Sequence, residues 1–395
     1  MKPVNDVLSQ FGTTIFETMS ILARKHGAIN LGQGFPDQDG PGFLKDIAVR
    51  AIQEQPNQYP PMPGLPELRQ AVAEHNKRFY NLNVDWETNV LVTSGATEAL
   101  AGALLALINP GDEVVLIEPV YDSYIPMILR AGGVPKTVRL MPPDWTLTRE
   151  ALEAAFSDKT KLILLNSPHN PAARVYSHDE LSMIAEMTQN YDTYALCDEV
   201  YEHIIFDEHK HIPLMSLPGM MERCIRIGSA GKTFSMTGWK VGYVTAPSHL
   251  HTALCKAHQF LTFTTPAMVQ YSVASGLGET DAYFDNLASD MRQKRDLLST
   301  GLKNAGFGVL DTQGTYFLSA DIRTTGFKGD DVEFCQHITE HAGVTALPMS
   351  AFYDGPRCTT SNQQTKPSYF VRFCFCKKES VLEAASAKLT EYFRG

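Results

Sequence analysis

Several short apolar runs of this chain end in residues that can bind an anion, donate a hydrogen bond or carry a proton. These residues are Ser94 to Thr97, Asn166 to Asn170, Asp198, and Ser229 with Lys232. In an open sheet of parallel strands the carboxyl ends meet at one edge, and ligands bind there. The pattern therefore predicts one site that combines an anion-binding helix start, a carboxamide, a carboxylate and a lysine.

The segment Ser94-Gly95-Ala96-Thr97 has the composition of a phosphate-binding helix start. A glycine at the entry to a helix lets the backbone approach a bound group, and the free N–H groups of the first turn favour a negative charge. An ordinary helix cap has the same composition and remains the alternative. No Gly-x-Gly-x-x-Gly pattern occurs, because Asp37 and Asp281 stand where LGQGFPD and SGLGETD would need the third glycine. A dinucleotide site is therefore not expected.

Asp198 ends an almost entirely apolar run, so its carboxylate is predicted to be buried. An unpaired buried charge is costly, and we therefore expect a cationic partner. A helix cap and an ion pair with an arginine are the structural alternatives. Lys232 stands among glycines and small hydroxyl residues, which indicates a chain that wraps closely around something small. A simple surface charge is the alternative for this lysine.

The elements that must position these residues alternate between strands and helices. The predicted strands are Val90–Thr93, Glu113–Ile117, Lys161–Leu165, Thr193–Cys197, Cys224–Ile227 and Val241–Thr245. The predicted helices between them are Thr97–Ile108, Tyr121–Ala131 and His178–Gln189. This alternation favours an α/β fold with a mostly parallel sheet and helices on both faces.

The pattern changes after Thr265-Pro266 to a long helix and then to strands mixed with glycine turns. We therefore expect a large domain over residues 41–280 and a smaller α+β domain over residues 281–395. Residues 1–40 are predicted to form an N-terminal arm and part of the small domain. The polar segment Gly355–Ser368 is predicted to be an exposed loop.

Composition excludes several classes of protein. A chain of 395 residues holds two to three domains at about 150 residues each. A net charge of −10 lacks the electrostatic footprint of a nucleic-acid binder, so a bound phosphate must be held locally. Seven scattered cysteines indicate reduced thiols, and no long apolar run occurs, so we expect a cytoplasmic protein with no membrane partner.

Two groups of metal-capable side chains stand close together in the sequence. They are the pair Cys374 and Cys376, and the histidines His203, His209 and His211. Neither group has a second half at metal-ligand spacing, so we expect no metal site.

The segments Ser229–Phe234 and Gly238–Gly242 resemble the lysine motif of the pyridoxal-phosphate-dependent class I/II aminotransferases. Further matching islands follow in the order of that family: Leu31–Pro36, Tyr59 with Pro63–Arg69, Ser94–Ala96, Glu118–Asp122, His169–Pro171, Cys197–Tyr201 and Phe370–Phe373. The resemblance covers nearly the whole chain and is nearest to the kynurenine aminotransferase, glutamine transaminase K and methionine aminotransferase branch. It implies fold type I, with a large, mostly parallel seven-stranded sheet domain and a smaller α+β domain.

The resemblance also implies roles at pyridoxal 5'-phosphate. Lys232 would bind the cofactor covalently and move the substrate proton, Asp198 would pair with the pyridine nitrogen, and Tyr201 would complete the catalytic set. Asn170 and Tyr201 would hydrogen-bond the phenolic oxygen, and Tyr121 would stack on the ring. The residues assigned to the phosphate are Gly95, Ala96, Ser229 and Lys240, with Tyr59 from a second subunit.

Substrate contacts are implied in the same way. Arg372 would bind the substrate α-carboxylate bidentately, although a structural ion pair would suit this arginine equally. The other residues assigned to the substrate are Asn170, Gly34, Phe16, Phe263 and Thr264, of which Phe263 and Thr264 would come from the second subunit of a homodimer. The aromatic members could instead belong to the core.

The resemblance therefore predicts a homodimeric aminotransferase that works by ping-pong half-reactions. It would move the amino group of a methionine, aromatic, glutamine or kynurenine type amino acid to a 2-oxo acid. One alternative keeps the cofactor but eliminates a thiol from cysteine conjugates as a C–S β-lyase. Another is a non-catalytic sensor module of a transcription regulator, which the negative charge and the retention of Lys232, Asp198 and Arg372 disfavour. One departure is Ala172-Ala173, which replaces the usual glycine after Pro171.

Overall fold

The computed structural model describes residues 2–355, 357–362 and 365–395. Its helices are α1 (Ile15–His26), α2 (Gly42–Glu54), α3 (Pro66–Tyr80), α4 (Trp86–Asn89), α5 (Ala96–Leu107), α6 (Tyr124–Arg130), α7 (Arg149–Glu153), α8 (His178–Asn190), α9 (Ala230–Thr233), α10 (Ser248–Leu261), α11 (Ala267–Leu277), α12 (Asp281–Asn304), α13 (Asp331–His337) and α14 (Glu379–Arg394). Its strands are β1 (Ile29–Asn30), β2 (Val90–Thr93), β3 (Glu113–Glu118), β4 (Val134–Arg139), β5 (Thr160–Asn166), β6 (Tyr194–Asp198), β7 (Cys224–Ser229), β8 (Gly242–Thr245), β9 (Gly308–Val309), β10 (Phe317–Asp321), β11 (Val344–Thr345), β12 (Leu347–Pro348), β13 (Thr359–Thr360) and β14 (Phe370–Cys374).

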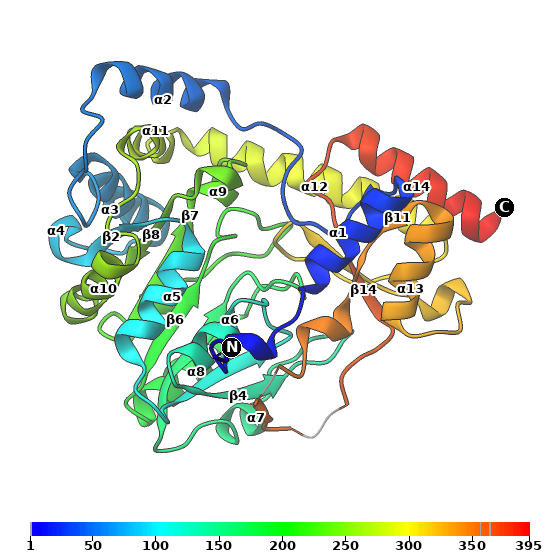
Figure 1. Cartoon of the computed structure of the whole chain (residues 1–395), viewed down its shortest axis with the longest axis horizontal. Coiled ribbons are helices and arrows are strands. Elements are labelled where there is room, and N and C mark those ends of the chain that lie inside the picture. Colours follow the sequence, from blue (N-terminus) through cyan, green and yellow to red (C-terminus); the bar gives the residue numbers. More distant parts are fainter. Residues whose placement is uncertain (1, 356, 363–364) are drawn as a thin grey trace.

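An eight-stranded sheet organises the larger part of the molecule, in the strand order β13-β4-β3-β5-β6-β7-β8-β2 (Figure 1). β8 runs antiparallel to β7 and β2, and every other neighbouring pair is parallel. The prediction of a large, mostly parallel sheet is confirmed. Because β5, β6 and β7 pair in parallel, their carboxyl ends lie along one edge.

Alternating side chains bury both faces of this sheet. Val114 and Leu116 of β3 belong to a core cluster that includes residues of α5, α6 and α10. Val115 and Ile117 of the same strand belong to a second cluster with residues of α8. Burial on both faces explains why the central strands are continuous apolar runs rather than alternating ones.

The sheet has eight strands rather than the expected seven, because part of the polar segment 355–368 forms an edge strand. β13 pairs in parallel with β4, and the hydroxyls of Thr137 and Thr360 are 3.0 Å apart. This part of the segment is therefore not the exposed loop that the sequence predicted. β4 itself was not among the predicted strands, since Pro135 and Lys136 interrupt its apolar pattern.

A smaller antiparallel sheet of order β12-β14-β10-β9 and a parallel pair of β1 with β11 form the rest of the β-structure. α12 packs along α14 beside this sheet (Figure 1). The pairing of Ile29 with Val344 joins the N-terminal segment to the C-terminal part of the chain. Among the described residues, no helix is long and apolar enough to cross a membrane.

A buried polar cluster lies against the large sheet. Arg226 of β7 donates to Glu199 at 2.6 Å and to Asn76 at 2.8 Å, and it also forms an ion pair with Glu202. Beside it, Nε2 of His75 and Nε2 of His203 are 2.7 Å apart. A network of this kind is stable only while its members keep their partners.

Three side chains of this region offer ligand atoms within 4.8 Å of one another, namely His75, Glu202 and His203. The two rings contact each other through Nε2, and Arg226 occupies the carboxylate of Glu202. A histidine that binds a metal donates its other ring N–H to an acceptor. Nδ1 of His75 is buried and has no hydrogen-bond partner among the described residues. The geometry therefore favours a protein hydrogen-bond network over a metal centre.

We expect the cofactor-free protein to lose stability as the pH falls below about 6.5, the ordinary histidine pKa. Burial lowers the pKa of His75 to about 3 and that of His203 to about 4. Below pH 6.5 the two histidines therefore bind protons in the unfolded chain but not in the folded chain. The free energy of unfolding falls until the pH reaches the pKa values of the folded state. At about pH 5 each ring accounts for about 2 kcal/mol of lost unfolding free energy.

Urea unfolding at about pH 7.5 and about pH 5 measures this loss. His203→Gln should reduce the difference between the two pH values by about 2 kcal/mol, because Gln does not titrate. His249→Gln is the matched control, since His249 is exposed on α10. An identical pH dependence in wild type and His203→Gln contradicts the prediction.

Candidate active site

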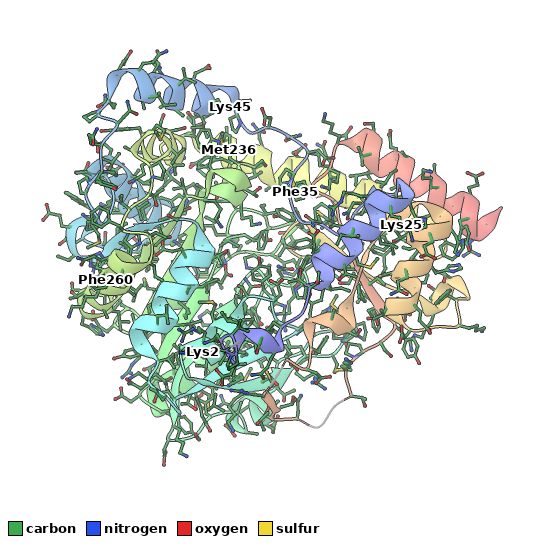
Figure 2. The ribbon with its side chains drawn as sticks, in the orientation of Figure 1. Lys2, Lys25, Phe35, Lys45, Met236 and Phe260 are labelled. Carbon is green, nitrogen blue, oxygen red and sulfur yellow. The ribbon has the colours of Figure 1, made fainter. Side chains whose placement is uncertain are left out.

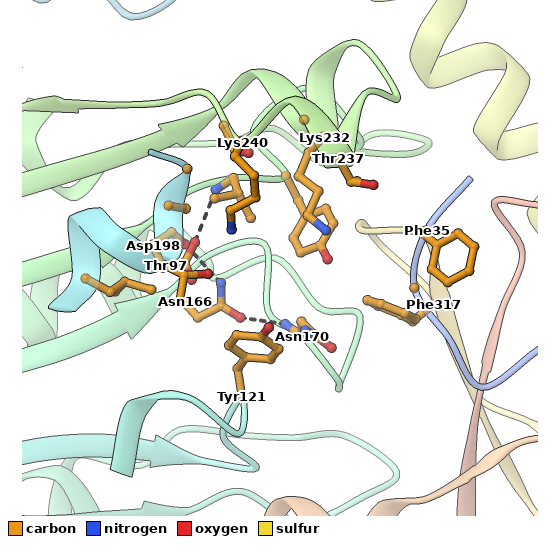
Figure 3. A pocket seen from close by; sticks show the side chains of 18 of the residues that line it. Phe35, Thr97, Tyr121, Asn166, Asn170, Asp198, Lys232, Thr237, Lys240 and Phe317 are labelled. Atoms are coloured by element: carbon orange, nitrogen blue, oxygen red, sulfur yellow. Dashed lines mark hydrogen bonds between the residues drawn. The ribbon is translucent and has the colours of Figure 1, made fainter. Parts of the chain in front are cut away.

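A cavity of about 270 Å³ opens beyond the carboxyl ends of β5, β6 and β7. The sequence-predicted site residues that line it are Phe16, Gly34, Gly95, Ala96, Tyr121, Asn170, Asp198, Tyr201, Ser229, Lys232, Lys240 and Arg372. In Figure 3, Lys232 and Lys240 point into this space from one side and Tyr121 faces them from the other. Residues from widely separated segments thus meet at the edge where the strand pattern placed a site.

An anion cradle forms where β2 leads into α5. Gly95 has a φ of +80°, and a Cβ there would lie 3.2 Å from Nζ of Lys240. The glycine therefore allows the lysine to approach the helix start. The first N–H groups of α5, including those of Ala96 and Thr97, have no helical carbonyl to accept them. These groups, Lys240 and the hydroxyl of Ser229 offer positive charge and donors to one small anion.

Asp198 is held by neutral donors rather than by a cation. The hydroxyl of Tyr124 donates to Oδ2 at 2.6 Å, and the backbone N–H of Val200 donates to Oδ1 at 3.4 Å. Asp198 is 5% exposed, and burial raises the pKa of its carboxyl. The arginine ion pair considered from sequence is absent within the described residues. The carboxylate therefore faces the cavity and can bind a cationic group of a ligand.

Lys232 lies on α9, the single turn that follows β7. Its Nζ donates to the hydroxyl of Tyr316 at 2.6 Å. Nζ also lies 5.5 Å from the ring centroid of Tyr201 and 5.2 Å from that of Tyr316. Burial lowers the pKa of the Lys232 ammonium, which increases the fraction of neutral, nucleophilic amine.

Arg372 of β14 is fully buried, with its guanidinium stacked on Phe317 at 3.8 Å from the ring centroid. Nη1 donates to Oδ1 of Asn170 at 2.8 Å, and Nη2 donates to the carbonyl of Gly32 at 2.9 Å. Nε has no partner among the described residues. Burial lowers the pKa of Arg372 to about 10. In the part of the chain that the structure describes, no carboxylate pairs with this arginine, so the structural ion pair considered from sequence is absent.

Tyr59, Phe263 and Thr264 do not line the cavity of this chain. Tyr59 is 82% exposed, and its ring packs edge-on against that of Phe263, with the centroids 5.3 Å apart. The hydroxyl of Thr264 donates to the carbonyl of Pro61 at 3.5 Å. Phe260 is 84% exposed at the end of α10, at the outer edge of the molecule (Figure 2). Tyr59, Phe260 and Phe263 are thus exposed apolar side chains that do not line the cavity.

Asn166 belongs to a predicted strand end, whereas Tyr124 and Tyr316 were not predicted from sequence. Asn166 donates to the carbonyl of Asp198 at 2.9 Å and accepts from the backbone N–H of Asn170 at 2.7 Å, so it joins two strand ends. Tyr124 stands three residues after Tyr121, a helical spacing that could have indicated a shared direction. Tyr316 carries no such signal, because a tyrosine before an apolar strand is typical of a core residue.

The departure at Ala172-Ala173 changes backbone energy more than geometry. Ala173 has a φ of +58° and is fully buried. An alanine in this left-handed region costs about 1–2 kcal/mol relative to glycine. Asn170 nevertheless lines the cavity, so its side chain remains available to the site.

The site fits pyridoxal phosphate on its own geometry. It offers a cradle for one phosphate, a buried carboxylate for a protonated ring nitrogen, and a lysine with a lowered pKa for an aldehyde. With this sheet and this cavity edge, these features define a pyridoxal-phosphate enzyme of fold type I.

The family model for aminotransferase class I and II matches residues 26–388, and the chain belongs to this family. It is therefore a pyridoxal-phosphate-dependent amino-acid aminotransferase, as the sequence resemblance predicted.

The chain is similar to named aminotransferases over almost its full length. A probable N-succinyldiaminopimelate aminotransferase of Mycobacterium tuberculosis is 45% identical over 385 residues, which cover 97% of each chain. A kynurenine–oxoglutarate transaminase of Dictyostelium discoideum is 39% identical, over 96% of this chain and 94% of the relative. The crystal structure of YbdL from Escherichia coli, described as a methionine aminotransferase, has a TM-score of 0.93 at 39% identity and covers 99% of this chain and all of that one.

Proposed function

We propose that Lys232, Asp198 and Tyr201 act at the cofactor and that Arg372 binds the α-carboxylate of the amino acid. One observation carries this proposal: a partly buried amine and a fully buried guanidinium, neither ion-paired among the described residues, face a single cavity. The amine suits covalent and acid–base chemistry, and the guanidinium suits a carboxylate. An amino acid presents the groups that both need.

When bound, pyridoxal phosphate supplies an aldehyde for the amino group and a ring that withdraws electrons from the α-carbon. Lys232, with its lowered pKa, would accept the proton of the substrate α-carbon as a neutral amine. It would then donate this proton to the C4′ carbon of the cofactor. Asp198 holds a proton on the pyridine nitrogen, and Tyr124 keeps that carboxylate oriented. Asp198 would thereby gain the cationic partner that its burial demands.

The remaining cofactor contacts divide between the two ends of the ring. Backbone N–H groups at Gly95 and Ala96, with Ser229 and Lys240, hold the phosphate. Asn170 and Tyr201 would hydrogen-bond the phenolic oxygen, and Tyr121 would stack on the ring, since all three line the cavity.

The cavity favours a neutral amino-acid side chain. Its lining cations among the described residues are Lys232, Lys240 and Arg372, each of which already has a proposed partner. Phe16, Phe35 and Phe317 add aromatic surface, while Gly34 lies beside Phe317. The preferred donors are therefore methionine, aromatic, glutamine or kynurenine type amino acids. A donor screen that also includes N-succinyldiaminopimelate tests this preference through keto-acid formation, and exclusive use of that dianionic donor contradicts it.

The active unit is a homodimer in this proposal. A second subunit would bring Tyr59 to the phosphate and Phe263 and Thr264 to the substrate, since none of the three lines its own cavity and Tyr59 and Phe263 are exposed. The exposure of Tyr59, Phe260 and Phe263 supports such a contact. Sedimentation of the wild-type protein should give the mass of a dimer. Phe260→Asp should weaken the association of the two subunits. A fully active monomer contradicts this arrangement.

The same proposal divides the chain into residues 1–40, 41–280 and 281–395, as the sequence indicated. The two sheets and the pairing of β1 with β11 support the division. A cytoplasmic location is supported by seven free cysteines. The C–S β-lyase alternative gains no support from the named relatives, which are aminotransferases.

Reduction with borohydride gives a direct test of the cofactor link. The purified protein should absorb in the near-ultraviolet or visible, and reduction should fix the cofactor to Lys232, where peptide mass spectrometry locates it. No absorption band, or fixation at another lysine, contradicts the assignment. Exposed Lys328 serves as the internal control peptide.

A further inference from the structure

The hydroxyl of Tyr316 connects Lys232 to the N-terminal segment. Nζ of Lys232 is 2.6 Å from this hydroxyl, and the hydroxyl is 2.7 Å from the carbonyl oxygen of Gly34. Tyr316 is 1% exposed and does not line the cavity. It therefore contacts the reactive amine without occupying the space meant for ligands.

The number of protons fixes the direction of both hydrogen bonds. A phenol has one proton, and a carbonyl oxygen can only accept, so the hydroxyl proton of Tyr316 points at Gly34. The phenol oxygen must then accept an N–H from Lys232. Burial raises the pKa of Tyr316 well above its usual value, so the phenol keeps its proton throughout. A neutral amine held in this way keeps its lone pair free.

We propose that Tyr316 is a positioning residue that holds the amino group of Lys232 whenever that group is not bonded to the cofactor. The inference rests on the proposed role of Lys232. In this role Tyr316 contacts neither the cofactor nor the substrate directly. Its function is to keep a flexible four-carbon side chain aimed so that the lone pair faces the α-carbon.

The carbonyl that anchors Tyr316 is itself fixed. A Cβ at Gly34 would lie 2.5 Å from the ring of Phe317, so the backbone packs directly on that ring. The carbonyl of Gly32, two residues earlier, accepts from Arg372 at 2.9 Å. One short segment therefore orients the amine through Tyr316 and the guanidinium directly. The two groups that must act on the same substrate share a common support.

Tyr316→Phe removes the acceptor and keeps the ring. We expect kcat to fall about 10-fold with KM nearly unchanged, the loss that one missing hydrogen bond predicts. An acceptor stabilises the ammonium more than the amine, so its removal should lower the pKa of Lys232 further. Competitive acetylation of the cofactor-free protein over a range of pH values, read on the Lys232 peptide, measures this shift without using activity.

Tyr353→Phe is the matched control. Its buried hydroxyl donates to the carbonyl of Leu140 at 2.9 Å, and Tyr353 does not line the cavity. A purely structural role for Tyr316 predicts that both variants lose thermal stability alike and that neither changes the acetylation profile of Lys232. An unchanged profile and an unchanged kcat in folded Tyr316→Phe overturn the proposal.

A second variant keeps the test informative if Tyr316→Phe fails to fold. Replacement of Tyr316 by 3,5-difluorotyrosine preserves shape and hydrogen bonding but weakens the oxygen as an acceptor. The acetylation pKa of Lys232 should then fall by a smaller amount, and no fall overturns the proposal. Failure of the proposed function is distinguished by borohydride reduction of the wild-type holoenzyme, which reports on cofactor attachment whatever Tyr316 does.

Discussion

Lys232→Ala should lower transamination by about 10⁴-fold or more. General acid–base catalysis alone contributes up to about 10⁴-fold, and this variant also loses the nucleophile that attaches the cofactor. Among the described residues that line the cavity, the other lysine is Lys240, and it lies against Gly95 in the anion cradle. Formation of the keto acid from the amino donor, followed over hours, measures the residual rate.

Two readouts separate loss of chemistry from loss of cofactor. Pyridoxal phosphate should still bind to Lys232→Ala without a covalent link, because the cradle and Asp198 are untouched. Borohydride should then leave no reduced adduct on any peptide. Exposed Lys328→Ala is the control and should retain wild-type turnover. Turnover within about 10-fold of wild type in Lys232→Ala would remove this lysine from the mechanism.

The sequence was most informative where a strand end carries chemistry. The runs before Gly95, Asn166, Asp198 and Ser229 are buried on both faces, so their apolar character was strong and their ends could be located. Lys232 follows the last of these ends, and the pattern therefore placed it at the same edge. Parallel pairing then brings these residues together without knowledge of the side-chain contacts.

Contacts between distant segments could not be predicted in this way. β4 was missed because Pro135 and Lys136 interrupt its apolar pattern, and β13 because two residues carry no pattern. His75 and His203 are 128 positions apart, so a search by spacing could not pair them. The hydrogen bond from Lys232 to Tyr316 depends on how the small sheet meets the large one. Neither local propensity nor periodicity contains that information.

Burial without an anionic partner among the described residues is the property of Arg372 that the sequence left open and the structure resolves. An arginine in a strand could have formed a structural ion pair, but the described residues supply only an amide oxygen and a carbonyl. A buried guanidinium that lacks an anion is costly, and a substrate carboxylate relieves that cost on binding. The ring centroid of Phe317 lies 3.8 Å from the guanidinium carbon, and this stacking orients the guanidinium plane for a bidentate contact.

Arg372→Lys should therefore raise KM for amino acids by about 10- to 100-fold and change kcat only a few-fold. Lysine keeps the positive charge but lacks the two parallel N–H donors of the guanidinium. One charge-assisted hydrogen bond to the carboxylate is therefore lost, which costs about 1.5–3 kcal/mol of binding free energy. The decisive measurement compares an amino acid with the matching amine that lacks the carboxylate. If Arg372 binds the carboxylate, the variant loses affinity only for the acid, and the preference for acid over amine shrinks by the same factor. Equal weakening of both ligands would assign Arg372 a structural role instead, and Arg149→Lys on the exposed face of α7 should alter neither.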